Sequence, residues 1–381
     1  MQKERIIQAL QGFAIGDSFA VGVEMKSRSW ILEHVDFTKY VNVFNGGKNN
    51  ISPGTYSDDT EHTIAVCEAL LESELKDDRF HEDMILAKCK HEYDTDKARK
   101  GFARNGHGSI EKWYKGEKTI DEVRQSQSTR ADPGNAPVMR SFPFAFVNVT
   151  DQQLQKWAIV NANATHPHPQ ARLASYLTIQ ICRHFLWNNK TPDLLVASLI
   201  HTVMDIKDFS PFGTEEDRKA VVDQLFKIDN LPSPDPVHFT LPTLEEYIVL
   251  HGVQPLPPIQ NLLVQFDYDP NVFGLPCSSL KTVWTLVYIL KHVTNPFDAL
   301  KASVNMGGDV DSLAAICVGI TAGLQGLSSI PEFIVQATEG MDRMVDLGTR
   351  MFANNRNTLT FWKCKYPSRT FEMEPLPQNE P

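Results

Sequence analysis

The sequence is poor in the features that mark several common classes of protein. Its six cysteines are scattered, with no Cys-x-x-Cys pair, so we expect reduced thiols in a cytoplasmic protein rather than a disulfide framework. Basic residues are too few for general nucleic-acid binding, because 37 Lys and Arg stand against 47 Asp and Glu. No run approaches the roughly 18 apolar residues of a membrane span. We therefore expect a soluble globular protein, and a monomer.

Helical spacing of apolar residues is the dominant pattern. Residues 1–19 resemble a secretion signal only superficially, because Gln8, Gln11 and Asp17 interrupt a helical pattern. Weaker helix candidates cover 191–204, 215–228 and 243–250, whereas strand-like stretches such as 40–44 are short and isolated. Four clear apolar stripes are Ile64, Cys67, Leu71 and Leu75; Ala174, Leu177, Ile181 and Phe185; Leu280, Val283, Trp284, Val287 and Tyr288; and Leu313, Ile316, Cys317, Ile320 and Leu324.

These stripes predict an all-α fold. We expect a single compact, orthogonal helical domain at residues 1–365 with long surface loops, notably the Pro-rich connections 230–242 and 252–276. A polar C-terminal tail at 366–381 follows it.

Two acidic signatures lie far apart in the chain, each just before a helical pattern. They are Ser57-Asp58-Asp59-Thr60 and Gly307-Gly308-Asp309-Val310-Asp311-Ser312. Carboxylates and hydroxyls without a Cys or His cluster suit Mg²⁺ or Mn²⁺ better than zinc or copper. A helix start would splay Asp58 and Asp59 and stabilise their charge, while two glycines allow the backbone to approach a ligand closely. Each signature alone also fits an ordinary helix cap, but their joint occurrence favours a metal site.

Several ordered motifs resemble the ADP-ribosylglycohydrolase family, the relatives of the dinitrogenase reductase-activating glycohydrolase. They run in family order from near residue 12 to near residue 326, while 185–274 carries nothing that matches. The motifs are Gly12-Phe13-Ala14-Ile15-Gly16-Asp17-Ser18 with Val23-Glu24-Met25, Tyr56-Ser57-Asp58-Asp59-Thr60-Glu61, Gly134-Asn135-Ala136-Pro137-Val138-Met139-Arg140, Thr165-His166-Pro167-His168-Pro169-Gln170-Ala171 and the Gly307 signature extended through Ala315.

The resemblance implies a metal-dependent hydrolase that cleaves the glycosidic bond between ADP-ribose and an acceptor, commonly an arginine or serine side chain of a protein. It implies two Mg²⁺ ions, with Mn²⁺ as a possible substitute, that bind the ribose diol and activate water. The metal ligands that it implies are Ser57, Asp58, Asp59, Asp309, Asp311 and Ser312.

The same resemblance implies further roles near this centre. Glu24 matches a glutamate that assists acid and base steps or gates access, and Asp59 is a second candidate for contacting the water. The substrate contacts that we expect are Asp58, Gly134, Asn135, Ala136, His166 and Gly308. Ala136 replaces the family's second glycine, and Pro137 restricts its backbone to extended conformations, which puts that contact in doubt.

Two other motifs have more ordinary interpretations. His166 and His168 have no third soft ligand nearby in sequence, so we do not expect zinc there. The Gly106-His107-Gly108-Ser109 segment is compatible with a phosphate-binding turn, although Gly-x-Gly alone is weak evidence and an ordinary loop is the simpler interpretation.

Two other functions share parts of this pattern. A catalytically silent relative would only bind ADP-ribose or serve a structural role, and the ligands retained at all six positions argue against it. A Mg²⁺-dependent phosphohydrolase would use the same hard ligands, but would release phosphate.

Overall fold

A computed structural model describes residues 1–41, 52–76, 79–101, 103–104, 106–252 and 274–365. Helices make up its regular structure, with short 3₁₀ helices η1 (Val21–Val23), η2 (Phe142–Phe146) and η3 (Pro192–Leu194). Within these ranges, β structure is limited to the isolated bridges Lys26–Gly308 and Leu275–Gly308. The α-helices are α1 (Lys3–Ala20), α2 (Arg28–His34), α3 (Asp58–Glu72), α4 (Glu82–Lys100), α5 (Ile110–Tyr114), α6 (Ile120–Ser128), α7 (Ala136–Met139), α8 (Asp151–Asn163), α9 (Pro169–Leu186), α10 (Leu195–Asp205), α11 (Glu215–Asp229), α12 (Leu244–His251), α14 (Ser279–His292), α15 (Pro296–Val304), α16 (Val310–Gln325), α17 (Glu332–Ala337) and α18 (Met341–Lys365).

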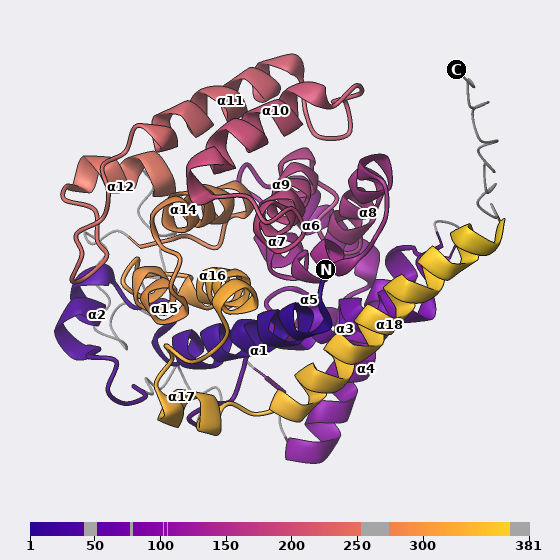
Figure 1. Cartoon of the computed structure of the whole chain (residues 1–381), viewed down its shortest axis with the longest axis horizontal. Coiled ribbons are helices and arrows are strands. Elements are labelled where there is room, and N and C mark those ends of the chain that lie inside the picture. The colour runs from indigo at the N-terminus through magenta and orange to yellow at the C-terminus, as the bar shows by residue number, and fades with distance from the viewer. Residues whose placement is uncertain (42–51, 77–78, 102, 105, 253–273, 366–381) are drawn as a thin grey trace, which may run out of the picture.

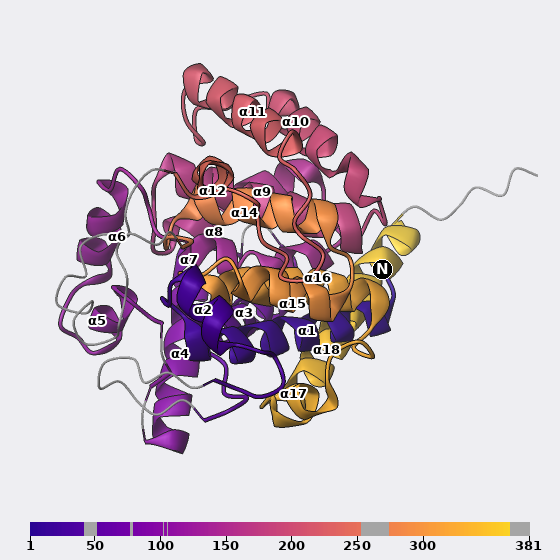
Figure 2. The ribbon, with the colours of Figure 1, turned by 90° about the vertical axis from the view of Figure 1, so that its left-hand side faces the viewer.

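Two helices at the centre of the molecule set the position of the site. Helices α1 and α16 lie side by side (Figures 1 and 2), and small residues allow their backbones to approach closely. A Cβ added at Gly12 would lie 2.5 Å from the Cβ of Ala322, and one at Gly16 would lie 2.3 Å from the carbonyl oxygen of Ala314. These contacts make the helices antiparallel, so the end of α1 meets the beginning of α16.

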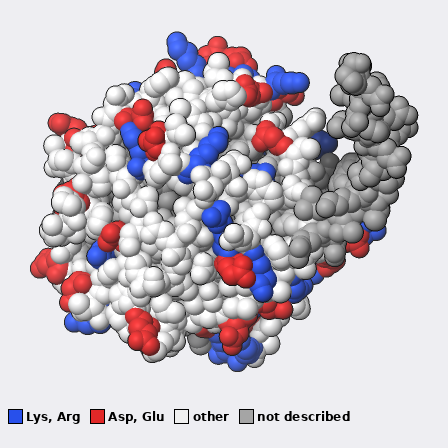
Figure 3. Space-filling model, in the orientation of Figure 1, with Lys and Arg blue, Asp and Glu red and all other residues white. Residues whose placement is uncertain are grey.

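Other helices enclose this pair. Helix α18 packs across α1, where Gly348 contacts Ile7. Helices α10, α11 and α12 form an outer group that covers α9 and α14 (Figure 2). On the face shown in Figure 3, Lys and Arg side chains are interspersed with Asp and Glu, so this face offers no continuous basic surface for a nucleic acid.

The all-α prediction is confirmed, and the predicted apolar stripes form the faces of α3, α9, α14 and α16. Leu75 is an exception, because α3 ends at Glu72 and Leu75 has a φ of 59°. The Ser73 hydroxyl donates to Leu70 O and accepts from Leu75 N, which offers the backbone an alternative to the helix. The domain limit at 365 stays a prediction, and the tail at 366–381 and residues 253–273 lie outside the described residues.

Helix α1 is also long and apolar enough to be compared with a membrane span. The apolar stretch covers Lys3–Val23, and 83% of an 18-residue segment within it is buried inside the protein. Its apolar character is therefore accounted for by packing in the core. The cysteines Cys67, Cys89, Cys182 and Cys317 are free and buried, whereas Cys277 is free and exposed.

Candidate metal centre

The two acidic signatures meet at one cavity of about 260 Å³. The end of α1 and the beginnings of α3 and α16 bring them there. Ser57 and Gly308 are buried beside the cavity rather than in its lining. The predicted site residues that line it are Glu24, Asp58, Asp59, Gly134, Asn135, Ala136, His166, Asp309, Asp311 and Ser312.

The first signature begins α3, as its capping residues predict. Ser57 is the N-cap, and its hydroxyl oxygen accepts a hydrogen bond from Asp59 N at 3.2 Å. Asp17 on α1 fixes this helix start, because its carboxylate accepts from Ser57 N at 2.9 Å and from Thr60 N at 2.9 Å. The Thr60 hydroxyl donates to the same carboxylate at 2.6 Å. Sequence reasoning assigned Asp17 no role, although an acid within an apolar helical stripe is a signal for one.

The second signature is joined to the Glu24 loop through Gly308. Gly308 N donates to Lys26 O at 2.8 Å, and Met25 N donates to Gly308 O at 2.7 Å. Leu275 lies on the other side, and a Cβ at Gly308 would be 2.2 Å from its carbonyl oxygen. Gly308 also has a φ of 81°, so the position favours glycine on both grounds. The glycine therefore allows Glu24 and Asp309 to be held side by side.

Carboxylates from both signatures crowd together with Glu24. One oxygen each from Glu24, Asp309 and Asp311 lies within 4.8 Å of the others. Burial raises the pKa of Asp58 to about 7, although the charge of His107 acts to lower it. Burial and the charge of Asp58 raise the pKa of Asp59 well above its usual value, and burial and the charge of Glu24 do the same for Asp311.

This crowding fits a hard divalent cation. Asp59 Oδ1 is a buried carboxylate oxygen that has no hydrogen-bond partner among the described residues. Buried carboxylates of like charge are costly unless a cation or proton balances them. Glu24, Asp309 and Asp311 lie close enough to share a cation, and Asp58 and Asp59 line the same cavity, so oxygen ligands of both signatures are candidates for holding Mg²⁺ or Mn²⁺.

An amide and a histidine also line the cavity. Asn135 Nδ2 donates to Asp309 Oδ2 at 2.8 Å, which orients that carboxylate. The hydroxyl oxygen of Thr165 accepts from Arg140 at 2.8 Å and lies 2.8 Å from His166 Nδ1. Burial and the charge of Arg140 lower the pKa of His166 well below its usual value, so the ring is neutral. In the tautomer in which Nδ1 accepts from the Thr165 hydroxyl, Nε2 carries the ring proton as a donor beside Gly134.

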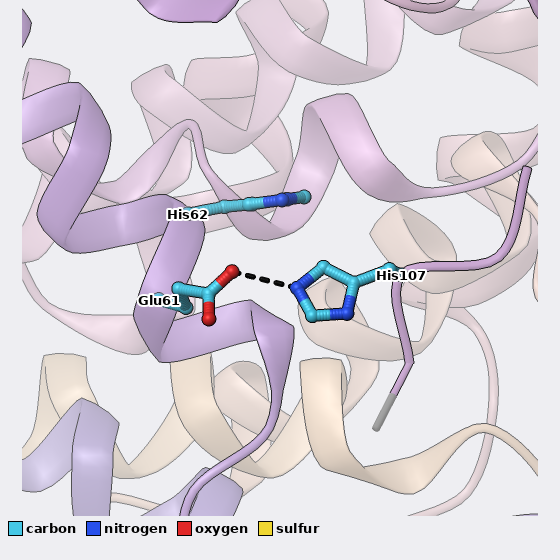
Figure 4. Close-up of side chains that lie close together, drawn as sticks. All are labelled: Glu61, His62 and His107. Atoms are coloured by element: carbon cyan, nitrogen blue, oxygen red, sulfur yellow. Dashed lines mark hydrogen bonds and ion pairs between the residues drawn. The ribbon is translucent and has the colours of Figure 1, made fainter. Parts of the chain in front are cut away.

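A second group of possible metal ligands lies next to this centre (Figure 4). It comprises Glu61 and His62 on α3 and His107, all buried, with His107 Nε2 only 2.6 Å from Glu61 Oε1. Two histidines and a glutamate are a zinc-type set. However, the hydrogen bond from His107 and the Arg104 guanidinium, 3.8 Å from Glu61 Oε2, already balance the Glu61 charge. The sequence did not indicate this group because 45 residues separate His62 from His107. Neither candidate ligand group found in the described ranges includes His166 or His168.

The glycine loop, residues 106–109, forms another part of the lining. Its Gly106 packs directly on a carboxylate of the first signature, because an added Cβ would lie 1.7 Å from Asp58 Oδ1. The exposed side chain of Arg130 also lines the cavity. The cavity therefore combines an acidic region with a region of glycine backbone and a basic side chain.

Comparison with known proteins identifies the family and the fold. The family model described as ADP-ribosylglycohydrolase matches residues 1–359. ADP-ribosyl-[dinitrogen reductase] glycohydrolase from Rhodospirillum rubrum is 24% identical over 186 residues, which cover 48% of this chain and 58% of that protein. A solved structure described as an ADP-ribosylglycohydrolase-related protein complex has a TM-score of 0.60 at 17% identity, covering 93% of this chain and 98% of the other. With this fold, this cavity and a family match along nearly its whole length, the chain belongs to the ADP-ribosylglycohydrolase family.

Proposed function

We propose that the protein is a metal-dependent hydrolase that releases ADP-ribose from an arginine- or serine-linked acceptor. The observation that carries this proposal is the meeting of both acidic signatures at one cavity. The name of the Rhodospirillum rubrum relative supports the substrate class, since that protein is an ADP-ribosyl glycohydrolase. The four buried free cysteines support a reducing compartment such as the cytoplasm.

The two regions of the cavity suit the two parts of ADP-ribose. The acidic region would bind the distal ribose, and bound Mg²⁺ would supply contacts to its diol and a lower pKa for the attacking water. The glycine loop and Arg130 would lie toward the diphosphate. Gly106 and Gly108 have φ values of 99° and 54°, and backbone N–H groups in such turns form anion-binding concavities.

The chain's own residues would handle the protons. Hydrolysis breaks the bond from the anomeric carbon to the acceptor nitrogen or oxygen and forms a bond to the water oxygen. Asp59, whose buried Oδ1 has no hydrogen-bond partner among the described residues, or Glu24 would take the proton of the water and pass it to the leaving acceptor nitrogen or oxygen. The surrounding carboxylates would offset the positive charge that develops on the ribose. His166 Nε2–H would donate to a substrate oxygen next to Gly134.

The experiment is product analysis on defined arginine- and serine-linked ADP-ribosyl peptides in Mg²⁺, with Asp309→Ala as the control. We expect free ADP-ribose and unmodified peptide from the wild type and none from the variant. ADP-ribose binding without turnover would instead favour a silent relative, and release of phosphate would favour a phosphohydrolase. Full activity of Asp309→Ala would refute the metal assignment.

A further inference from the structure

Both ring nitrogens of His107 are used inside the protein. Nε2 lies 2.6 Å from Glu61 Oε1, and Nδ1 lies 3.1 Å from the carbonyl oxygen of Arg104. A carbonyl oxygen only accepts, so Nδ1 donates to Arg104 O, and Nε2 is bound to the Glu61 carboxylate. The side chains of His107 and Glu61 are each 1% exposed. His107 is therefore held as a buried ion pair and has no ring donor left for a ligand.

Glu61 lies in the first turn of α3, together with two predicted metal ligands. One helical turn thus carries Asp58 and Asp59 toward the metal centre and Glu61 toward the glycine loop. The loop returns to the same turn through Gly106, which packs on the Asp58 carboxylate. Any movement of the loop relative to α3 would have to break the ion pair or open this contact.

Arg104 fixes the chain just before the loop to other helices. Its guanidinium stacks 3.6 Å from the Tyr56 ring centroid and donates to Tyr56 O at 2.8 Å. It also forms ion pairs with Asp96 of α4 and with Glu339. These partners keep Arg104 away from the cavity, so it supports the loop as His107 does.

The loop itself presents backbone donors. The backbone N–H groups of His107, Gly108 and Ser109 have no hydrogen-bond acceptor among the described residues, and all three residues line the cavity. Donors of this kind bind an anion only when their direction is fixed, because a mobile loop must be ordered at a cost in affinity. What fixes them here is the His107 side chain.

We propose that Glu61 and His107 are positioning residues whose ion pair holds the glycine loop at a set distance from the metal ligands, so that the diphosphate and the distal ribose of one substrate are bound together. This inference rests on the proposed function. It adds to that function how the glycine loop and the metal ligands are held at fixed positions relative to one another. It also gives the Glu61–His62–His107 group a role that requires no metal ion.

The test compares Glu61→Gln and His107→Gln with Glu92→Gln. Glu92 is buried and pairs with the half-buried Arg343 at 2.7 and 2.8 Å, and neither residue lines the cavity. All three variants should lose thermal stability, which makes Glu92→Gln the matched control. The measurements are the dissociation constants of Mg²⁺ and of ADP-ribose by calorimetry, and kcat and KM on an ADP-ribosyl peptide.

We expect Glu61→Gln and His107→Gln each to weaken ADP-ribose binding and raise KM at least tenfold. The Mg²⁺ dissociation constant and kcat should change less than threefold, and the double variant should be no worse than the worse single variant. Glu92→Gln should leave both ligand affinities unchanged. If Glu61→Gln does not fold, His107→Gln decides the result.

Unchanged ADP-ribose affinity in His107→Gln would overturn the inference while leaving the proposed function intact. Failure of the wild type to bind ADP-ribose would instead refute the proposed function. One equivalent of Zn²⁺ in the wild type that both variants lose would show a metal site in place of the ion pair, and would also overturn the inference.

Discussion

At the scale of single residues, the positions of the predicted metal ligands depend on Asp17, a buried side chain outside the cavity that binds the start of α3. Asp17 is fully buried, does not line the cavity described above and receives three hydrogen bonds from the start of α3. Those bonds fix the two residues that flank Asp58 and Asp59. The placement of the predicted metal ligands is thus determined from α1, forty residues earlier in the chain.

Asp17→Asn tests this dependence. An amide cannot accept from both Ser57 N and Thr60 N, so one buried donor loses its acceptor, at a cost of about 1–3 kcal/mol in the free energy of unfolding. We expect that loss in denaturant unfolding and at least tenfold weaker Mg²⁺ binding by calorimetry. Asp36→Asn is the control, because Asp36 accepts from Thr38 in a similar local pattern on the surface, and it should change neither quantity. Unchanged Mg²⁺ affinity in Asp17→Asn would contradict this role.

At the scale of helices, the sequence predicted what is encoded locally. Ser57 caps α3 at the helix start that the first signature predicted, because a capping side chain acts on the backbone within a few residues. The polar helix α4 was not predicted, because its surface carries many charges and little apolar periodicity. The Glu61–His107 pair and the Asp17 contacts could not be predicted either, because they join residues 46 and about 40 positions apart through the packing of whole helices.

The crossing of α1 and α16 offers a test at this scale. Gly16→Ala would place a methyl group 2.3 Å from Ala314 O and push apart α1, which leads through η1 to Glu24, and α16, which carries Asp311. We expect a loss of about 1–3 kcal/mol in the free energy of unfolding and weaker Mg²⁺ binding. Gly101→Ala is the control for backbone strain, since Gly101 has a φ of 79° and open space around it. It should cost about 1 kcal/mol and leave Mg²⁺ affinity unchanged, and equal Mg²⁺ affinities in the two variants would contradict the account.

At the scale of the whole molecule, the buried carboxylates link folding to pH and metal. Burial raises the pKa of Asp58 to about 7 and raises those of Asp59 and Asp311 well above their usual values. Groups whose pKa is higher in the folded state bind more protons when folded, so stability falls as pH rises through the folded pKa. Cations that bind the ionised form reverse this loss by binding only the folded state.

The metal-free protein should therefore lose thermal stability between about pH 5 and 8, the range above the ordinary carboxylate pKa in which Asp58 ionises. Added Mg²⁺ should raise Tm, and by more at pH 8 than at pH 5. Calorimetric scans in a chelator and in Mg²⁺ measure both effects. The double variant Asp58→Asn/Asp311→Asn should show a weaker dependence of Tm on pH. A wild-type Tm that rises between pH 5 and 8 in a chelator would contradict the raised pKa values of these carboxyl groups.

The central claim is that both acidic signatures form one metal centre that supports hydrolysis of an ADP-ribosyl bond. The most direct test is the initial rate of ADP-ribose release as a function of Mg²⁺ concentration, for the wild type, Asp59→Asn and Asp311→Asn. We predict saturable activation by Mg²⁺ in the wild type, no activity in a chelator, and at least a hundredfold loss in each variant. Full activity in a chelator, or a loss confined to variants of one signature, would contradict the account.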